Sequence, residues 1–542
     1  MVPMEFLRSS GVLFHPTSLA SNGGIGDLGP AAHDFVHFLA AARQHIWQVL
    51  PLSPTGYGNS PYAASSAFAG NSYLISLEYL AQWGWISHDR IADLPGPPAN
   101  STPGSNVDFD QVESSKLPLL LEAAANFLDR GPHDSALAQQ WAAFESFCSA
   151  EASWLVDYAY YAVLRAKFST GAWTAWPEPL RRRRPAALAQ FAHEHGRALA
   201  IEQILQFAFS QQWNALRELA ARSAIRILGD VAIFVNMDSA DVWVHPELFE
   251  LDADLQPIRV AGVPPDYFSA TGQRWGNPLY RWDVLEADGF NWWIHRIRRA
   301  CALYDIVRLD HFRGFEAYWA IPAEEETAVK GEWVKAPGKD LFEALEAELG
   351  DLPLVAEDLG VITPQVEALR AGLGLPTMRV MQFGFSNKGA HPHLPHLYTH
   401  GIVAYTGTHD NDTTQGWWNT ASKVERAAVE AYVGPVQQRS EQDGSEQDRP
   451  VWPLIRALCT SVAEMAIVPA QDLLELDSSA RMNTPAVPSG NWSWRAPSSS
   501  FTPALAERLA ALVAVTDREY DPLGQDDAAD EPTSNPSNGK TE

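Results

Sequence analysis

Eight short runs rich in Val, Ile and Leu are spaced along the chain, and they restrict its fold more than any other feature of the sequence. They are residues 11–15, 46–50, 225–235, 305–310, 353–358, 378–385, 402–407 and 466–474. The runs are continuously apolar instead of alternating, which is typical of parallel strands with both faces buried. Because amphipathic helical patterns lie between several of them, we expect an α/β fold built as one (β/α)8 TIM barrel.

Two long segments interrupt the strand–helix repeat. Residues 76–224 are too long for a single crossover and carry mostly helical patterns, while residues 236–290 are rich in Pro, Gly and aromatic side chains. We therefore expect a single catalytic barrel over residues 1–515, with a large helical insertion at 76–224 and a loop-rich insertion at 236–290. Residues 516–542 are acidic and poor in large apolar side chains, so we expect them to form a disordered tail.

The net charge of −27 restricts the choice of partner. The chain has 39 Lys and Arg residues against 66 Asp and Glu residues. Such a field repels nucleic acid, anionic membranes and polyanionic substrates, so none of these is expected as a partner. A neutral or cationic ligand fits this charge better. Many of the 20 Trp residues also stand in polar loops, as in GQRWGNPLYRW and SGNWSWR. Flat rings in polar loops suit a ligand with apolar faces and hydroxyl edges, as a sugar has.

The three cysteines, Cys148, Cys301 and Cys459, indicate a reducing compartment. Their number is odd, and their spacing fits neither a disulfide framework nor a metal site. No run of 18 apolar residues is present, so we expect a cytoplasmic protein without a membrane span. The stretch GIGDLG matches a dinucleotide-binding pattern, but no Asp or Glu occurs between Asp34 and Glu78, so no organic cofactor is expected.

Acidic residues follow three of the predicted strands, in the stretches RLDHFRG, AEDLG and THDNDT. These residues are Asp310, Glu357, Asp358, Asp410 and Asp412. The carboxyl ends of barrel strands converge on one mouth, so we expect the three acidic turns to meet there. Taken singly, Asp358 and Asp412 could instead be helix N-caps, a common role for Asp after a strand.

Arg308 stands two residues before Asp310 in the run 305–310, so both side chains point to the same face of that strand. A strand that is otherwise buried thus carries a cation and an anion side by side. The arginine would keep the aspartate ionised despite partial burial, and an ionised carboxylate is what a nucleophile or a metal ligand must be.

Two chemistries use several carboxylates in this way. Magnesium enzymes gather them around an octahedral ion, whereas glycosidases use one carboxylate as nucleophile and another as acid. Arg308 and His409 weigh against a divalent cation, because cationic donors compete with it, so the paired-carboxylate interpretation is favoured and no metal is expected. The three histidines of HPHLPH (391–396) are interpreted as a Pro-spaced loop, with a stray metal site as the alternative.

Seven stretches of the chain resemble the 4-alpha-glucanotransferases known as amylomaltases or disproportionating enzymes, a family of the alpha-amylase clan. They are LPLSPTGYGNSPYAASSAFAGN, GDVAIFVNMDSADVW, VAGVPPDYFSATGQRWGNPLYRW, RLDHFRGF, AEDLG, YTGTHDNDT and RMNTPAVPSGNWSWR, in the family's order over roughly residues 5–500. The resemblance implies that Asp310 is the nucleophile, Glu357 the general acid/base and Asp410 the stabiliser of the transition state.

The resemblance also implies a set of sugar contacts, part of it on a mobile loop over the cleft that carries Asp266, Tyr267 and Trp275. The implied contacts are Tyr57, Ser60, Tyr62, Asp266, Tyr267, Gln273, Trp275, Arg308, His311, Phe383, His409 and Asn483. Two positions depart from the family pattern, since Ala232 stands where the family usually has Pro and Ala486 where it usually has Gly.

The family resemblance further implies a retaining transfer reaction. A segment of an alpha-1,4-glucan (a maltooligosaccharide or amylose) would pass to the 4-hydroxyl of another glucan, or of glucose, through a covalent glycosyl-enzyme, with the two carboxyl groups about 5–5.5 Å apart. Three alternatives stay open: a hydrolase of the same clan, a glucan-binding protein on an inactive barrel, and a metal-dependent barrel enzyme. The complete carboxylate set speaks against the second, because a binding protein needs no pair of nucleophile and acid.

Overall fold

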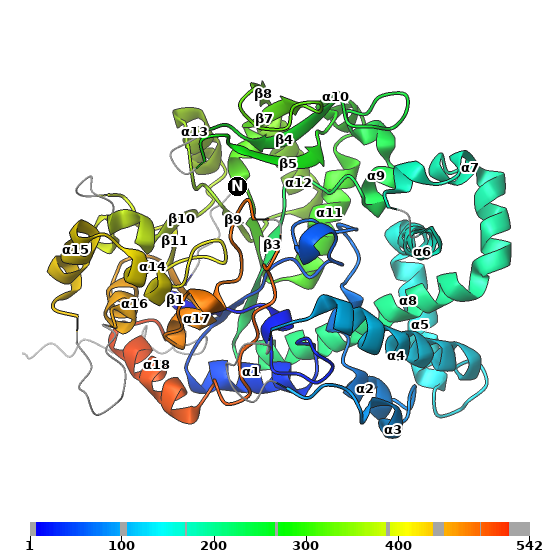
Figure 1. The fold of residues 1–542 in the computed structure, drawn as a ribbon, viewed down its shortest axis with the longest axis horizontal. Coiled ribbons are helices and arrows are strands. Elements are labelled where there is room, and N and C mark those ends of the chain that lie inside the picture. The colour runs from blue at the N-terminus through cyan, green and yellow to red at the C-terminus, as the bar shows by residue number, and fades with distance from the viewer. Residues whose placement is uncertain are drawn as a thin grey trace, which may run out of the picture.

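The computed structural model describes residues 7–97, 106–168, 171–265, 269–385, 391–436, 449–487 and 489–519. At its centre, eight parallel strands form a nearly closed barrel (Figure 1). The strands are β1 (Ser9–Leu13), β2 (Ile46–Gln48), β3 (Arg226–Val231), β6 (Ile306–Leu309), β9 (Leu354–Ala356), β10 (Thr377–Val380), β11 (Ile402–Tyr405) and β12 (Met465–Pro469). Each overlaps one of the eight predicted runs, and they follow one another around the sheet in chain order, so the predicted (β/α)8 fold is confirmed.

The barrel is joined least tightly between β9 and β10, the two ends of the strand order. There the N–H of Ala356 donates to the carbonyl of Pro376 at 3.1 Å. Asp358 adds a side-chain bridge, because its buried carboxylate accepts hydrogen bonds from the N–H of Met378 at 2.8 Å and from the hydroxyl of Thr377. Asp358 therefore ties β9 to β10 and is not an N-cap, so that alternative is wrong for this residue.

Helices pack around the outside of the barrel. They include α1 (Pro30–Ala41), α11 (Asn291–Leu303), α12 (Gly338–Leu349), α13 (Pro364–Gly372), α14 (Thr414–Thr420), α15 (Lys423–Val433), α16 (Val451–Cys459) and α18 (Pro503–Val515). Two predicted strands end early: residues 381–385 form a 3₁₀ helix, and α17 (Ala470–Leu473) follows β12 directly. Pro469 stops β12, because a proline has no N–H to continue the ladder.

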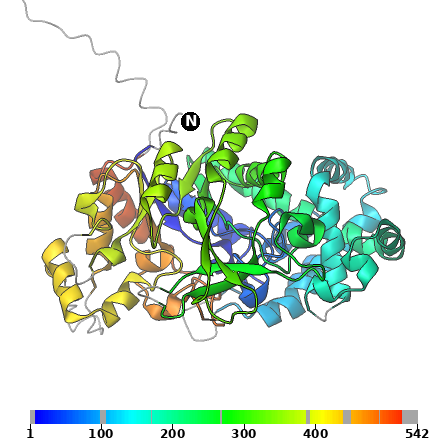
Figure 2. The ribbon, with the colours of Figure 1, turned by 90° about the horizontal axis from the view of Figure 1, so that it is seen from above.

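The segment 76–224 contains a block of helices. They are α2 (Leu77–Gln82), α3 (His88–Ile91), α4 (Phe109–Arg130), α5 (Ala138–Ala150), α6 (Ala152–Lys167), α7 (Glu178–Arg181) and α8 (Pro185–Arg222). Figures 1 and 2 show the cyan helices of this block on one side of the barrel, opposite the yellow α14–α16 region.

The long helix α8 holds the loop that leads away from β2. The buried amide of Gln206 accepts from the N–H of Gly70 at 2.8 Å and donates to the carbonyl of Gly70 at 2.9 Å. Gln212 makes the same pair of bonds with Ser76, at 2.7 and 3.0 Å. Buried amides that satisfy a loop backbone in this way hold it in one position. Because Tyr62 lies in that loop, the insertion also supports one side of the barrel mouth.

A second, smaller sheet stands next to the barrel, with four antiparallel strands in the order β5–β4–β7–β8 (Figure 1). The strands are β4 (Arg259–Val263), β5 (Gln273–Pro278), β7 (Ala317–Pro322) and β8 (Glu332–Lys335). The sequence analysis did not predict it. The segment 236–290 also holds the short helices α9 (Ala240–Val244) and α10 (Trp282–Ala287).

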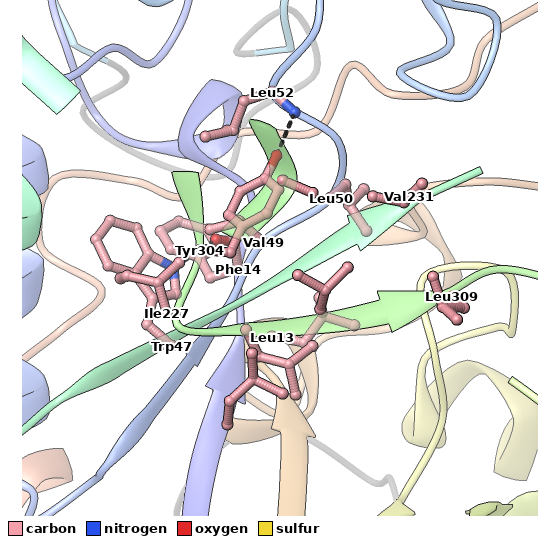
Figure 3. Packing of buried hydrophobic residues seen from close by; sticks show 14 of the residues in the cluster. Leu13, Phe14, Trp47, Val49, Leu50, Leu52, Ile227, Val231, Tyr304 and Leu309 are labelled. Carbon is pink, nitrogen blue, oxygen red and sulfur yellow. Dashed lines mark hydrogen bonds between the residues drawn. The ribbon is translucent and has the colours of Figure 1, made fainter. Parts of the chain in front are cut away.

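Apolar side chains of the strands belong to one continuous buried core, and Figure 3 shows Leu13, Ile227 and Leu309 among them. Tyr304 packs close to Gly229, where a Cβ atom would come within 2.1 Å of the tyrosine ring. The hydroxyl of Tyr304 accepts a hydrogen bond from the N–H of Leu52 at 3.2 Å (dashed in Figure 3). A glycine is therefore required at residue 229, and its close contact with Tyr304 fixes β3 beside β6.

The chain after α18 stays in the folded body for several residues. Arg518 is fully buried, and its guanidinium donates to the carbonyls of Ser9 and Cys459, both at 2.8 Å. Thr516 is also buried. The expected start of a disordered tail at residue 516 is therefore wrong, because a buried guanidinium with backbone partners anchors this segment. Residues 520–542 lie outside the described part of the chain.

No helix in the described ranges has the length and apolar character that a membrane span requires.

Candidate active site

The carboxylates of Asp310, Glu357 and Asp410 stand in the turns that follow β6, β9 and β11. The structure brings these three turns together at one mouth of the barrel, as the strand order predicts. A continuous series of contacts joins Asp310 to Asp410, through Arg308, Asp230, Tyr62 and His409. Glu357 is joined to the turn of Asp310 by a hydrogen bond from the backbone of His311.

The buried guanidinium of Arg308 lies between two carboxylates. Its Nη1 atom is 2.5 Å from Oδ2 of Asp230 and 3.0 Å from Oδ1 of Asp310. Burial alone would lower the pKa of Arg308, but Asp230 and Asp310 raise it well above its usual value. Arg308 is therefore a permanent cation between the two carboxylates. Burial raises the pKa of Asp230 to about 7, and Arg308 opposes that rise.

Asp230 is a site residue that the sequence analysis missed. It lies near the end of β3 in register with Arg308 of β6, so the two side chains meet across neighbouring strands. Besides Arg308, its Oδ2 atom accepts a hydrogen bond from the hydroxyl of Tyr62 at 2.7 Å. Its signal was an acidic residue within the apolar run 225–235, comparable to the position of Arg308 in its own run.

Glu357 is set up to hold a proton. Its Oε2 atom accepts from the N–H of His311 at 2.8 Å, and its Oε1 atom accepts from the N–H of Leu359 at 3.0 Å. Burial raises the pKa of Glu357 to about 8, with Arg308 opposing the rise and Asp310 adding to it. The half-buried Asp310 has the Arg308 cation as a direct partner instead. The two carboxyl groups therefore have opposite surroundings, which is how a pair of acids takes two different roles.

His311 forms the turn between Asp310 and the Glu357 loop. Its φ angle of 49° is in the left-handed region, which directs its N–H at Glu357. Burial, with Arg313 nearby, lowers the pKa of His311 to about 3, so the ring is neutral at neutral pH. The Trp275 ring of β5 meets this imidazole edge to face, at 4.8 Å and 86°. The small sheet thus supplies one wall of the mouth.

Trp275 is 38% exposed, and its indole N–H donates to the side-chain oxygen of Gln273 at 3.2 Å. Both residues therefore present partly open surface beside His311, as sugar contacts require. Asp266 and Tyr267, which were expected on the same loop, lie outside the described residues.

Asp410 is the most exposed of the three carboxylates, with 48% of its side chain open. Asn483 donates from Nδ2 to Oδ1 of Asp410 at 2.6 Å, and the N–H of Asn483 donates to the carbonyl of His409 at 3.1 Å. The buried ring of His409 stacks on Tyr62, at 5.1 Å and 13°. Burial lowers the pKa of His409 although Asp410 opposes this, so the ring is a neutral donor beside Asp410.

The remaining expected sugar contacts, Ser60, Tyr57 and Phe383, differ in how far they are buried. The hydroxyl of Ser60 accepts from the N–H of Tyr62 at 3.2 Å, so Ser60 shapes the loop of Tyr62. Tyr57 is 77% exposed. Phe383, in the 3₁₀ helix after β10, is half-buried with its ring against His393 at 5.5 Å. The structure joins Ser60 to the central network, and Tyr57 accepts a hydrogen bond from the N–H of Ser60 at 3.4 Å through its backbone carbonyl.

Asp412 supports the turn of Asp410 and caps no helix. Its Oδ2 atom accepts from the hydroxyl of Ser478 at 2.7 Å, while Thr413 is the N-cap of α14. The N-cap alternative is therefore wrong for Asp412 as well. The described ranges contain no group of three or more His, Cys, Asp or Glu side chains that could hold a metal ion. In the HPHLPH stretch, His393 instead accepts a hydrogen bond from the N–H of Val380 at 3.0 Å.

Ala486 occupies a backbone conformation that favours glycine. Its φ angle is +64°, in the left-handed region where a Cβ atom costs about 1–2 kcal/mol. The resemblance singled this position out because the family usually has Gly there. The loop of residues 482–492 thus keeps the glycine conformation without the glycine.

Comparisons with known proteins agree with this geometry. The sequence profile of a family described as 4-alpha-glucanotransferase matches residues 14–500. The chain is 48% identical over 519 residues to a 4-alpha-glucanotransferase of Thermus thermophilus, which covers 95% of this chain and 100% of that protein. It is 46% identical over 491 residues to one of Synechocystis, covering 90% of this chain and 94% of that protein.

Among solved structures, an amylomaltase from Streptococcus agalactiae in complex with acarbose is similar to this chain, with a TM-score of 0.87 and 37% sequence identity. The match covers 94% of this chain and 99% of that one. The sequence profile, the relatives and the fold all identify the same activity, and the chain belongs to the 4-alpha-glucanotransferase family of the alpha-amylase clan.

Proposed function

We propose that this 4-alpha-glucanotransferase works by a retaining double displacement in which Asp310 is the nucleophile, Glu357 the general acid/base and Asp410 the stabiliser of the transition state. The observation that carries the proposal is the contrast between the two inner carboxyl groups. Asp310 has the cation of Arg308 at 3.0 Å, whereas burial raises the pKa of Glu357 to about 8. One group is thus supported as an anion and the other as an acid.

In the first step, Asp310 attacks the anomeric carbon while the bond from that carbon to the departing 4-oxygen breaks. Oδ1 of Asp310 is held by Arg308, and Oδ2 makes no hydrogen bond with the described residues, so Oδ2 is the attacking atom. The proton of Glu357 passes to the departing oxygen. This leaves a glycosyl ester on Asp310 and a carboxylate at Glu357, with the two groups about 5–5.5 Å apart.

In the second step, the Glu357 carboxylate removes the proton from the 4-hydroxyl of an acceptor, whose oxygen attacks the same anomeric carbon. The ester bond to Asp310 breaks, and both groups return to their starting protonation states. The two inversions give net retention. Asp410, together with the neutral ring of His409, binds hydroxyl groups of the distorted sugar and stabilises its oxocarbenium-like state.

The acceptor is a glucan or glucose, in preference to water, because the mouth carries partly exposed groups that hold a sugar. Trp275 and Gln273 of β5 offer a ring and an amide beside His311. An oriented acceptor gains an effective concentration of about 10⁵ M or more, which exceeds that of bulk water. Maltooligosaccharides and amylose are the proposed donors, and Tyr57, Ser60, Phe383 and the loop residues Asp266 and Tyr267 are further proposed contacts.

Two further statements complete the proposal. The reaction needs no organic cofactor or metal, because two carboxyl groups supply both the nucleophile and the proton transfer. The proposed compartment is the cytoplasm, which the three free thiols of Cys148, Cys301 and Cys459 support. The acidic chain is not proposed to bind nucleic acid or membranes.

The product pattern from maltotriose tests transfer against hydrolysis. We expect glucose and a ladder of longer maltooligosaccharides, with little net gain of reducing ends. A steady rise of reducing ends without any chain longer than three sugars would make the protein a hydrolase. Truncation of Trp275 to Ala should shift the ratio toward hydrolysis, because the acceptor loses its ring contact.

The residue roles are tested by two substitutions. Asp310→Ala should lower turnover by about 10⁴-fold or more without unfolding the protein, and residual activity above about 1% would contradict its role as nucleophile. Glu357→Gln should impair natural glucans far more than an α-maltosyl fluoride, because fluoride leaves without a proton. Glu348→Gln, on the exposed face of α12, is the matched control and should leave both rates unchanged.

A further inference from the structure

Three hydrogen bonds join the turn that carries Asp310 to the turn that carries Glu357. The N–H of His311 donates to Oε2 of Glu357 at 2.8 Å, and the N–H of Phe312 donates to the carbonyl of Glu357 at 3.0 Å. The third bond runs from Nη1 of Arg313 to the carbonyl of Val361 at 2.5 Å. The first two are made by the backbone, whereas the third depends on a side chain.

Arg313 is held in an unusual way for a buried cation. Its side chain forms no ion pair in the described part of the chain, although the residue is only 5% exposed. The guanidinium instead lies over the ring of Trp333 in β8, with 3.7 Å from its central carbon to the ring centroid. Trp333 is in turn held by Trp319 of β7, edge to face at 5.3 Å. The small sheet therefore supports the arginine from behind.

On either side of Val361, the partly buried side chains of Leu359 and Ile362 pack against the core, but Val361 itself does not. The side chain of Val361 is 59% exposed, so burial does not fix it. Gly360 has a φ of +87°, and a Cβ atom built there would meet nothing within 4 Å. The hydrogen bond from Arg313 to the carbonyl of Val361 adds a polar restraint to this packing, four residues after Glu357.

We propose that Arg313 is a positioning residue that holds the acid/base turn against the nucleophile turn, through the Val361 carbonyl and the Trp333 ring. This proposal rests on the proposed roles of Asp310 and Glu357. Its consequence is specific to one chemical function: loosening the loop displaces the Glu357 carboxyl from the departing oxygen, while Asp310 stays in place directly after β6, where Arg308 holds it. Displacements of about 1 Å at a reacting group can lower rates by about 10²-fold.

The test is a pair of donors measured in the first turnover, with enzyme in excess. Release of glucose from maltotriose requires a proton from Glu357, whereas release of fluoride from α-maltosyl fluoride does not. Arg313→Met keeps the length of the side chain and removes the guanidinium. Arg508→Met is the matched control, because Arg508 also lies 3.7 Å from a ring centroid, that of Trp452, but in α18.

We expect Arg313→Met to slow the first turnover of maltotriose by about 10²-fold and that of the fluoride by less than about 10-fold. Arg313→Lys should give an intermediate loss, since lysine can reach a carbonyl but lacks the planar fork that stacks on Trp333. Arg508→Met should change neither rate. An equal loss on both donors, or a loss no larger than in the control, would overturn the proposal.

Two further variants make the result decisive. If Arg313→Met does not fold, Trp333→Leu takes its place, because this variant removes the ring that supports the guanidinium and keeps the arginine. Trp333→Leu should show the same donor selectivity with a smaller loss of rate. Glu357→Gln separates the two proposals. If this variant shows donor selectivity and the Arg313 and Trp333 variants do not, only the positioning role fails. If Glu357→Gln itself shows none, the assignment of the acid fails.

Discussion

Replacing Asp230 by Leu tests the charge network beneath the site. The change leaves the buried Arg308 with one carboxylate, Asp310, of which 29% of the side chain is exposed. Removing one partner of a buried ion pair costs about 3–5 kcal/mol, and the remaining contact with Asp310 places this case near the lower limit. Tyr62 also loses the acceptor of its hydroxyl, which adds about 1 kcal/mol. We therefore expect the free energy of unfolding to fall by about 3–4 kcal/mol.

The assay is unfolding in guanidinium chloride, followed by tryptophan fluorescence, together with turnover of maltotriose. The double variant Asp230→Leu/Arg308→Met removes the unpaired cation as well, so we expect it to regain at least about 2 kcal/mol of stability while remaining inactive. Glu332→Gln, which breaks an exposed ion pair with Arg259, is the control and should cost less than about 1 kcal/mol. A loss below about 1 kcal/mol for Asp230→Leu, or a double variant no more stable than the single one, would refute the reasoning.

Four further predictions follow from the same structure. The value of kcat/KM should fall as the pH rises through about 8, because burial raises the pKa of Glu357 to about 8 and the first step needs the protonated form of Glu357. A profile of kcat/KM that is flat from about pH 7 to about pH 9 would contradict this. Ala486→Gly should raise the free energy of unfolding by about 0.5–1 kcal/mol by relieving the positive φ, whereas Ala511→Gly, in α18, should lower it by about 1 kcal/mol. Arg518→Ala should cost about 3 kcal/mol or more in thermal unfolding, whereas deleting residues 523–542 should leave the melting temperature nearly unchanged. EDTA should leave turnover unchanged, and a loss that Mg²⁺ or Ca²⁺ restores would contradict the metal-free mechanism.

The barrel could be predicted because its strands are buried on both faces and therefore read as apolar runs. The small sheet could not, because its two edge strands lack that signal. β5, QRWGNP, contains Gly and Pro, and every residue of β8, EWVK, is at least partly exposed. Each edge strand pairs with the strand before it in the chain, and the sheet is completed by the pairing of β4 with β7, which lie far from one another in the chain. Short-range sequence patterns do not record that pairing.

The site was predictable to the extent that strand ends determine it. Asp310, Glu357 and Asp410 were expected at one mouth because parallel strands end together. The contacts of each group were not predictable, since they depend on residues that are distant in sequence. Asn483, expected to touch sugar, uses its amide on Asp410 itself, at 2.6 Å. It therefore orients that carboxylate before any sugar binds.

Charged residues within the apolar runs identify more residues of the site than the sequence analysis recognised. Arg308 was recognised in this way, and Asp230 has the same signal in its own run. Asp472, in the run 466–474, is a third case. Its buried carboxylate accepts hydrogen bonds from the hydroxyl of Thr406 at 2.6 Å and from the N–H of Thr414 at 2.7 Å.

These two threonines flank the turn that carries Asp410, so Asp472 fixes that turn from α17, directly after β12, as Asp358 fixes the seam beside Glu357. The physical reason is common to all four charges. A buried charge is tolerated only where it is paired or fully hydrogen-bonded, and at the end of a barrel strand the available partners are the neighbouring strands and turns of the mouth. A buried charge at the carboxyl end of a predicted barrel strand therefore indicates a residue that builds the active site, even when it is not one of the reacting groups.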